Sequence, residues 1–382
     1  MPAPTRRILF VTAEFPPRRG GIADHVIRLR SSLEDLGART YVATEAASQD
    51  SPVDRVYRLA PNPWCRQIVT VLRLVRRFRN DIVHIQYQAG AFDSALQAPL
   101  MPWALRLMGF SGLVVVTFHD LAEPFVFPRA GPLRRRVVDL LRGWADVCIY
   151  VDALDRACVS ARIPGEWRRS QYIPAGPTIE PPPSLGTRDE ARRDLGLPAD
   201  AFLVGFFGFR QAGKGLDVLA AAMRNRALAK CDARLALIGG AGPDVGARRA
   251  AAPVPPSTFA GVNVLEPGYL EAPEISRWLR ACDVAALPYD DGLSTRRGSF
   301  MVAAAHGLPV VTTTPVRPDL LDVRPGEVAF TPVRDPESLA AALVRVRDDS
   351  EYRSTLEAGS QAVARRYSWR RIARQTLDAY GG

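Results

Sequence analysis

The segment DDGLSTRRGSFMVAAAHGLPVVTTT, residues 290–314, predicts a polar loop, then a short helix, then a strand. The loop contains Arg296 and Arg297, and residues 300–305 form an apolar run with helical character. Gly307 can adopt the left-handed conformation that ends helices, and a β-branched strand follows it. A loop leading into a helix N-terminus offers unpaired N–H groups to an anion, and arginine suits phosphate. The segment therefore predicts an anion site, although a surface loop with two solvated arginines is the alternative.

The composition is that of a globular protein with two or more domains. The chain has 382 residues, of which 47% are hydrophobic and 24% are charged. Its formal net charge of +10 allows anionic small substrates, anionic lipid or nucleic acid as partners. Several arginine clusters carry apolar residues at helical spacing, which favours amphipathic helices with a basic, solvated face. These clusters are residues 66–79, 129–142, 162–169 and 365–374.

Membrane and export signals are not expected. No stretch approaches the roughly 20 apolar residues that a transmembrane helix needs. The first apolar run ends at Glu14, which predicts a strand rather than a signal peptide. Five scattered cysteines without metal-binding spacing predict reduced thiols. We therefore expect a cytoplasmic protein, which the basic helices could bring to the inner face of a membrane.

Apolar runs of strand length alternate with helical patterns along the chain. In the first half we predict strands at residues 7–13, 40–44, 81–86, 112–118 and 147–151, a short one near 173, and helices at 22–36, 91–108 and 132–145. A proline-rich segment at 174–185 predicts a linker. Beyond it we predict strands at 201–207, 234–238, 284–287, 309–313 and near 328, and helices at 216–224, 273–281, 336–348, 351–365 and 369–380. This alternation predicts an α/β fold with two parallel sheets, whose ligands bind at the carboxyl ends of the strands.

Two loops of the first half carry candidate ligand-binding residues. Gly20 and Gly21 lie between a strand and a helix, where glycine lets the backbone approach a ligand, although a tight turn is the alternative. His119 follows a buried strand, and its imidazole could hydrogen-bond a sugar hydroxyl or orient a reacting group. A half-buried histidine held by a carbonyl is the alternative. The other three histidines look structural, and no pair has the spacing of metal ligands.

Candidate residues in the second half follow one another along a single α/β pattern. Arg210 and Lys214, in the loop GFFGFRQAGKG, precede a predicted helix and could bind a diphosphate at its N-terminus. The glycine spacing of this loop is not that of a P-loop. Further candidates for close approach of a nucleotide to the backbone are Gly208, Gly239, Tyr269 and Leu270.

Taken in this order, the motifs resemble the retaining glycosyltransferases of the family-4 type, which have the GT-B fold. The resemblance covers essentially the whole chain, through the segments ILFVTAEFPPRRGGIADHV, VVVTFHD, FFGFRQAGKGLDVL, ALIGG, EPGYL and LPYDDGLSTRRGSFMVAAAHGLPVVTT. It implies two Rossmann-like domains facing each other across a cleft, an acceptor domain at 1–180 and a nucleotide-sugar donor domain at 181–365. The segment 366–382 looks like the family's terminal helix, which packs back onto the first domain.

The resemblance implies an enzyme that moves a sugar from a nucleotide-diphosphate sugar to an acceptor hydroxyl, with retention. It implies that Gly20 and Gly21 face the donor phosphates, that His119 lies beside the donor sugar, and that Lys214 and Arg210 bind the diphosphate. The other candidate donor contacts are Gly208, Gly239, Tyr269, Leu270, Ser294, Arg296, Arg297, Gly298 and Ser299. We expect no metal, since no D-x-D-like pair stands out, and no cofactor beyond the nucleotide sugar as co-substrate.

The sequence departs from the family at a pair of glutamates. Aligning on the strand after Gly307 places Ser294 and Val302 where most relatives have glutamate. The second glutamate accepts hydrogen bonds from the nucleotide ribose, which Val302 cannot do. Ribose recognition is therefore expected to differ, and the turn at 296–299 could supply another way of holding the phosphates.

Two other functions remain open from the sequence. One is a non-catalytic GT-B-like protein that binds nucleotide sugars or an anionic membrane, and the other is a GT-B sugar-nucleotide epimerase. Nucleic-acid binding is not expected, because the basic clusters lack interleaved exposed aromatic residues. The sequence does not specify the sugar, the base or the acceptor, and a lipid-linked acceptor and a soluble natural product both fit it.

Overall fold

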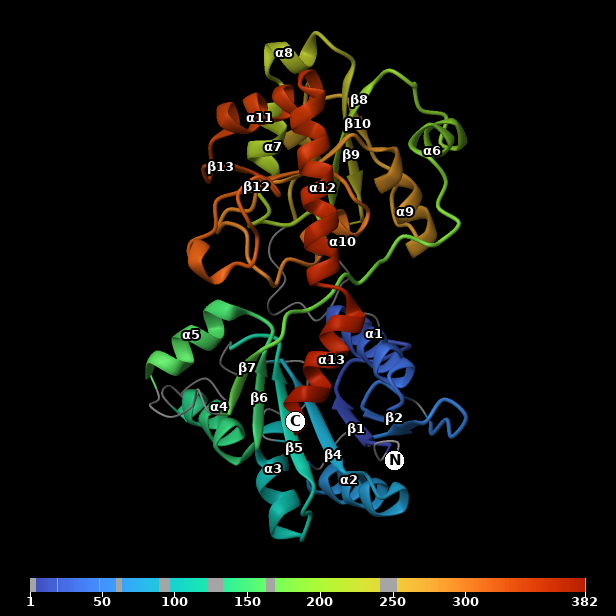
Figure 1. The fold of residues 1–382 in the computed structure, drawn as a ribbon, viewed down its shortest axis with the longest axis vertical. Helices are drawn as coiled ribbons and strands as arrows, with labels where there is room; N and C mark the ends of the chain where they lie inside the picture. Colours follow the sequence, from blue (N-terminus) through green and yellow to red (C-terminus); the bar gives the residue numbers. More distant parts are fainter. Residues whose placement is uncertain are drawn as a thin grey trace. The chain divides into compact units, whose positions relative to one another are not determined.

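A computed structural model of the chain (Figure 1) describes residues 5–18, 20–47, 49–59, 64–88, 97–121, 133–162, 169–240 and 253–381. The chain forms two compact units. The N-terminal unit comprises Met1–Gly176 with Ser368–Gly382, and the C-terminal unit comprises Pro177–Tyr367. Each unit contains one parallel sheet covered by helices, so the predicted fold class of two Rossmann-like domains is confirmed.

The sheet of the N-terminal unit has the order β3-β2-β1-β4-β5-β6-β7, and its strands pair in parallel. Its strands are β1 (Arg7–Thr12), β2 (Arg39–Thr44), β3 (Val56–Arg58), β4 (Ile82–Tyr87), β5 (Leu113–Phe118), β6 (Val147–Tyr150) and β7 (Ser170–Tyr172). Its helices are α1 (Gly21–Asp35), α2 (Trp64–Phe78), α3 (Gln97–Leu107), α4 (Leu133–Trp144), α5 (Ala153–Arg162) and α13 (Trp369–Ala379).

Alternate residues of each strand face two different helix layers, because successive side chains of a strand point to opposite faces. Leu9 and Val11 of β1 lie in a core that also holds buried residues of α2, α3 and α4. Ile8 and Phe10 lie in the opposite core, with α1 and α13. Helix α13 (red) packs against α1 (blue), so the end of the chain completes the unit that its beginning starts (Figure 1).

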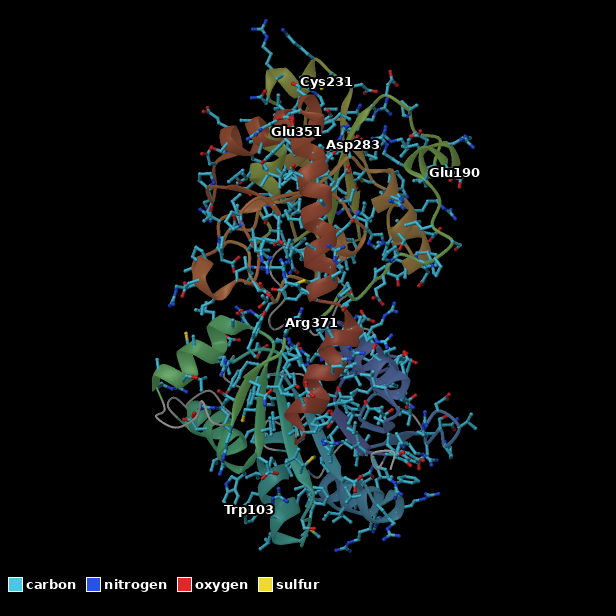
Figure 2. The ribbon with its side chains drawn as sticks, in the orientation of Figure 1. Trp103, Glu190, Cys231, Asp283, Glu351 and Arg371 are labelled. Atoms are coloured by element: carbon cyan, nitrogen blue, oxygen red, sulfur yellow. The ribbon has the colours of Figure 1, made fainter. Side chains whose placement is uncertain are left out.

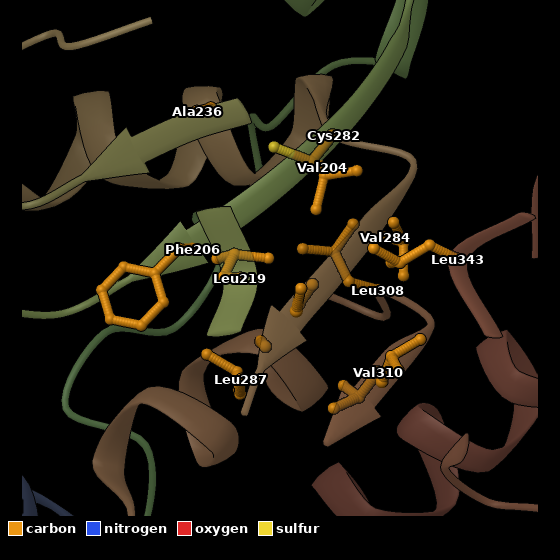
Figure 3. Close-up of a cluster of buried hydrophobic side chains, with 14 of the residues drawn as sticks. Val204, Phe206, Leu219, Ala236, Cys282, Val284, Leu287, Leu308, Val310 and Leu343 are labelled. Carbon is orange, nitrogen blue, oxygen red and sulfur yellow. The ribbon is translucent and has the colours of Figure 1, made fainter. Parts of the chain in front are cut away.

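The sheet of the C-terminal unit has the order β10-β9-β8-β11-β12-β13. Its strands are β8 (Phe202–Phe207), β9 (Ala233–Ile238), β10 (Val264–Leu265), β11 (Val284–Leu287), β12 (Val310–Thr313) and β13 (Ala329–Thr331). Its helices are α6 (Arg188–Asp194), α7 (Leu216–Met223), α8 (Arg226–Ala229), α9 (Ala272–Ala281), α10 (Gly298–Ala305), α11 (Pro336–Asp348) and α12 (Ser350–Arg366). Figure 3 shows its core, where Val204, Leu287 and Val310 from three neighbouring strands are buried with Leu343 of α11.

Most of the predicted elements are present at the predicted places. The helix predicted from residue 91 begins at Gln97, and residues 89–96 lie outside the described part of the chain. Strands β3 and β10 and helices α5, α6 and α8 were not predicted from the sequence. The five cysteines are free thiols, as expected. In the described part of the chain, none of the helices has the length and apolar character needed to cross a membrane.

Candidate functional site

Lys214 and Arg297 meet at the ring of Tyr289 in the C-terminal unit. Tyr289 lies just beyond the carboxyl end of β11 and is fully buried. The Nζ atom of Lys214 lies 5.5 Å from the centroid of its ring, and Cζ of Arg297 lies 4.6 Å from the same centroid. Aromatic faces attract cations at these distances. One ring therefore holds together two basic side chains that are far apart in the sequence.

The turn before α10 is tied to the same tyrosine. The Tyr289 hydroxyl forms a hydrogen bond of 2.7 Å with Oγ of Ser299, in the first turn of α10. A Cβ atom on Gly208, directly after β8, would lie 3.9 Å from Cβ of Ser299. The helix begins after Arg297 without a side-chain cap, and the N–H groups of Gly298 and Phe300 donate to the carbonyls of Arg296 and Arg297. The N-terminus of α10 therefore lies beside the same ring as Lys214 and Arg297.

Gly215 fixes the backbone beside Lys214. It caps α7 with a φ of 64°, in the left-handed region, and again no side chain caps this helix. A Cβ atom at this position would lie 1.8 Å from the carbonyl oxygen of Pro288, at the end of β11. Only glycine allows this contact, which sets Lys214 against the strand end that leads into Tyr289.

The charges around Tyr289 are unbalanced. Burial lowers the pKa of Lys214 to about 8, with the positive charge of Arg297 as a further cause, and Asp291 opposes the shift. Arg297 forms an ion pair with the exposed carboxylate of Asp291, while its buried Nε atom has no partner among the described residues. An anion bound here would offset the repulsion between the two cations and would satisfy the guanidinium.

Gly208 and Gly239, which directly follow β8 and β9, lie beside the turn before α10. A Cβ atom on Gly239, whose φ is 116°, would lie 2.8 Å from the carbonyl oxygen of Gly208, so the two backbones are in contact. Arg210 is turned to another partner, since its Nη1 atom lies 2.6 Å from Oε2 of Glu266. Arg210 must therefore leave or share this carboxylate if it is to bind a phosphate.

The remaining candidates of the C-terminal unit vary in exposure. Ser294 is half-buried and Arg296 is exposed. Tyr269 is 68% exposed, while Leu270 packs partly against the core. Val302, which the sequence resemblance aligns with a glutamate, is fully buried inside α10. It belongs to the core and offers no group to a ligand.

In the N-terminal unit, the start of α1 is bound by a carboxylate of the chain itself. A Cβ atom on Gly20 would lie 2.2 Å from Oε2 of Glu14, while nothing lies near Gly21. Burial raises the pKa of Glu14, and the attraction of Arg18 and a hydrogen bond from the N–H of Ile22 oppose the shift. Glu14 therefore occupies the helix N-terminus to which the sequence resemblance assigned a phosphate.

His119 lies in a cluster of histidines. Its Nε2 atom lies 2.8 Å from Oε1 of Gln86, and its ring meets the ring of His25 edge-on, at 4.8 Å between centroids. The ring of His25 also contacts Trp369, at 5.2 Å. Because an amide oxygen only accepts hydrogen bonds, Nε2 of His119 carries the proton in this arrangement, and Nδ1 can accept one from a hydroxyl.

Comparison with known proteins identifies the family. The family model described as "Glycosyl transferases group 1" matches residues 201–349. A D-inositol 3-phosphate glycosyltransferase of Xylanimonas cellulosilytica is 32% identical, over 94% of this chain and 91% of the relative. The chain belongs to the group 1 glycosyltransferases.

Solved structures share the GT-B fold of this glycosyltransferase. Sucrose-phosphate synthase from Thermosynechococcus elongatus superposes with a TM-score of 0.72 at 20% identity, covering 98% of each chain. The Anabaena protein HepE, solved in complex with UDP and glucose, has a TM-score of 0.68 at 17% identity and also covers 98% of each chain. At these identities, the likeness concerns the fold alone.

Several side chains at the candidate site were not singled out from the sequence. Tyr289 and Asp291 were passed over, although Tyr289 lies two residues after a predicted strand and directly before the polar loop. Glu14 and Gln86 likewise lie at the carboxyl ends of buried strands. A polar or aromatic residue at such a strand end, where ligands of parallel sheets bind, was the available signal.

The histidine cluster predicts a loss of stability in weak acid. Burial lowers the pKa of His84 to about 3 and that of His25 to about 4, and it lowers the pKa of His119 well below its usual value. The unfolded chain, with ordinary histidine pKa values, binds protons first. The free energy of unfolding should therefore fall by about 2 kcal/mol per buried histidine between pH 7 and pH 5. Denaturant unfolding at a series of pH values measures this slope.

The variant His25→Phe serves as the control for this slope. It keeps an aromatic ring against Trp369 and His119 but removes one titrating group. The slope should become smaller in the variant. A free energy of unfolding that does not change between pH 7 and pH 5 would contradict the burial of neutral histidines.

Proposed function

We propose that this glycosyltransferase transfers a sugar from a nucleotide-diphosphate sugar to an acceptor hydroxyl, with retention of configuration and without a divalent metal. The observation that carries the proposal is the meeting of Lys214 and Arg297 at Tyr289, beside the uncapped N-termini of α7 and α10. Two cations and two helix N-termini form an environment suited to a diphosphate.

The same groups would act on the chemical step. As the glycosidic bond breaks, negative charge develops on the β-phosphate of the leaving nucleotide. Lys214, Arg297 and the N-terminal turn of α10 are fixed in place and would stabilise this charge without reorganisation. In the proposal, these groups neutralise the diphosphate where other transferases use a metal ion. For the described residues, no cluster of three or more potential metal ligands occurs.

The N-terminal unit would bind the acceptor and contribute His119. With its Nε2 proton donated to Gln86, His119 could accept a hydrogen bond from a sugar hydroxyl through Nδ1. Glu14, which lies at the start of α1, would favour an uncharged group over a phosphate at that place. The acceptor hydroxyl would attack from the same face as the leaving group, which gives retention.

The identity of the donor is supported by the comparisons only as a class. HepE was solved with UDP and glucose, and the relative from Xylanimonas is named for D-inositol 3-phosphate. A uridine diphosphate sugar is therefore the first donor to test. Because Val302 is buried, the ribose would be held by groups other than the usual glutamate. Since nucleotide sugars are cytosolic metabolites, we place the reaction in the cytoplasm.

The proposal is tested by incubating the protein with labelled nucleotide sugars and a panel of acceptors, including D-inositol 3-phosphate. We expect release of nucleoside diphosphate that depends on an acceptor and is unaffected by EDTA, and a product with the donor's anomeric configuration by NMR. Tight donor binding without turnover would instead indicate a non-catalytic protein. Donor conversion in the absence of any acceptor would indicate an epimerase. Loss of activity on chelation would overturn the metal-free mechanism.

The lowered pKa of Lys214 can be measured directly by NMR. Of the fifty basic residues of the chain, only Lys214 and Lys230 are lysines. After reductive methylation with ¹³C-formaldehyde, the lysine signal that is missing in Lys214→Ala should titrate with a pKa of about 8. Because Lys214 loses its charge as pH rises through 8, affinity for a nucleoside diphosphate should fall about tenfold between pH 7 and pH 9. A Lys214 signal that titrates at the ordinary lysine pKa of about 10.4 would contradict the buried environment of Lys214.

A further inference from the structure

One face of the N-terminal unit exposes an unusual number of large apolar side chains. Among the described residues, twelve large hydrophobic side chains are exposed, and five of these lie on α3, directly after it, or on α4. They are Trp103, Leu107, Met108, Leu140 and Trp144, with Leu107 71% exposed. Trp103 is labelled on α3 in Figure 2. Isolated exposed apolar residues are ordinary, but a gathering on two helices that pack together marks an interaction surface.

The same helix layer is strongly basic. Helices α2, α3 and α4 together contain nine arginines and one acidic residue, Asp139. Asp139 pairs with Arg142, and Arg106 pairs with Asp146. The arginines of α2 are exposed, and within the described residues none of them forms an ion pair; they are Arg66, Arg73, Arg76 and Arg77. This charge is therefore free to attract an anionic partner.

The apolar and basic residues belong to one face. Buried residues of α2, α3 and α4 contribute to the same core, so the outer sides of these helices all point away from the same side of the sheet. Helix α2 packs against α3, and Nη2 of Arg76 reaches the carbonyl of Met108. The opposite layer, α1 and α13, carries five arginines against four acidic residues. Its charge is nearly balanced, so the asymmetry belongs to the α2–α4 face.

We propose that the outer face of α2, α3 and α4 docks the N-terminal unit onto the surface of an anionic lipid bilayer. Tryptophan and aliphatic side chains enter the boundary between headgroups and acyl chains, while arginines pair with lipid phosphates. Trp103, Trp144, Leu107 and Leu140 match the first role, and the arginines of α2 match the second. Docking leaves the residues around Tyr289 uninvolved, so it is independent of the proposed sugar transfer.

Other occupants fit the face less well. A second copy of the chain would bring two arginine-rich layers together, and like charges repel. A nucleic acid would match the arginines, but aliphatic Leu107 and Leu140 offer it no stacking surface. A bilayer accepts both the charge and the apolar side chains.

Cosedimentation of the full chain with sucrose-loaded vesicles tests the proposal without any activity assay. We expect binding to vesicles of phosphatidylcholine with 30% phosphatidylglycerol, little binding to phosphatidylcholine alone, and a marked loss in high salt. The double variant Leu107→Ser, Leu140→Ser should lower the partition coefficient at least fivefold. The double variant Arg66→Gln, Arg73→Gln, which changes only exposed side chains of α2, should lower it at least tenfold.

Matched controls lie elsewhere on the chain. Val316 is as exposed as Leu107, at 71%, and Val316→Ser should leave vesicle binding unchanged. Arg370→Gln with Arg374→Gln removes two exposed arginines from α13 on the opposite face and should also have no effect. Equal binding to neutral and anionic vesicles, equal loss in the controls, or a dimer that Leu107→Ser dissociates would each overturn the proposal. Thermal unfolding of every variant identifies a loss of folding.

Discussion

Replacing Lys214 by alanine should raise the dissociation constant for a nucleoside diphosphate at least tenfold, about 1.4 kcal/mol. Hydrogen bonds to charged groups contribute about 1.5–3 kcal/mol, and the variant removes one such donor from beside Arg297. The value of kcat/KM should fall by at least the same factor, because the charge on the leaving diphosphate grows in the transition state. Isothermal titration calorimetry and steady-state kinetics measure the two effects.

The second lysine of the chain provides the matched control. Lys230→Ala removes an exposed lysine from the same unit and the same amount of net charge. The dissociation constant of Lys230→Ala for the nucleoside diphosphate should equal that of the unsubstituted protein. If Lys214→Ala also leaves the constant unchanged, Lys214 does not contact the diphosphate. If both variants weaken binding equally, the effect comes from net charge rather than from a contact.

Replacing Gly215 by alanine should destabilise the C-terminal unit by about 3 kcal/mol. The new Cβ atom would lie 1.8 Å from the carbonyl oxygen of Pro288, so the loop or the end of β11 must move. The left-handed φ of 64° adds strain for any side chain. Differential scanning calorimetry should show a lower unfolding temperature, and the displaced Lys214 should bind nucleoside diphosphate more weakly.

Gly213→Ala separates the steric contact from the backbone strain. Gly213 also has a left-handed φ, of 86°, but nothing lies within 4 Å of a Cβ atom at its position. This variant should lose only about 1 kcal/mol. Equal destabilisation by the two substitutions would show that the close packing of Gly215 on Pro288 does not form in solution.

The elements that could be predicted from the sequence are those whose local pattern matches their burial. Strands β1 and β8 are near-continuous apolar runs and are buried throughout most of their length. Helix α6 could not be found this way, because RDEARRD contains a single apolar residue. It is stabilised by tertiary contacts, since Arg192, which is 3% exposed, bonds to Asp283 and to backbone carbonyls. Only the capping box of Thr187 and Glu190 was a local signal for it.

The basic side chains of the candidate site could be predicted from the sequence. Most of the residues that they contact could not. Lys214 and Arg297 were recognised as loop cations before helices, and the structure brings them to one ring. The pairing of Arg210 with Glu266 joins residues 56 positions apart, so no local pattern reveals it. The position of Glu14 over Gly20 also depends on how the loop folds. Such contacts arise from the tertiary fold and not from residue spacing.

The most direct test of the account is a solved structure of the protein with the nucleoside diphosphate that stabilises it most in a thermal-shift screen. We expect oxygen atoms of the β-phosphate to lie within hydrogen-bond reach, about 3 Å, of Nζ of Lys214 and of the guanidinium of Arg297. The phosphate should also face the first N–H groups of α10. A nucleotide bound with its diphosphate away from the ring of Tyr289 would contradict the account.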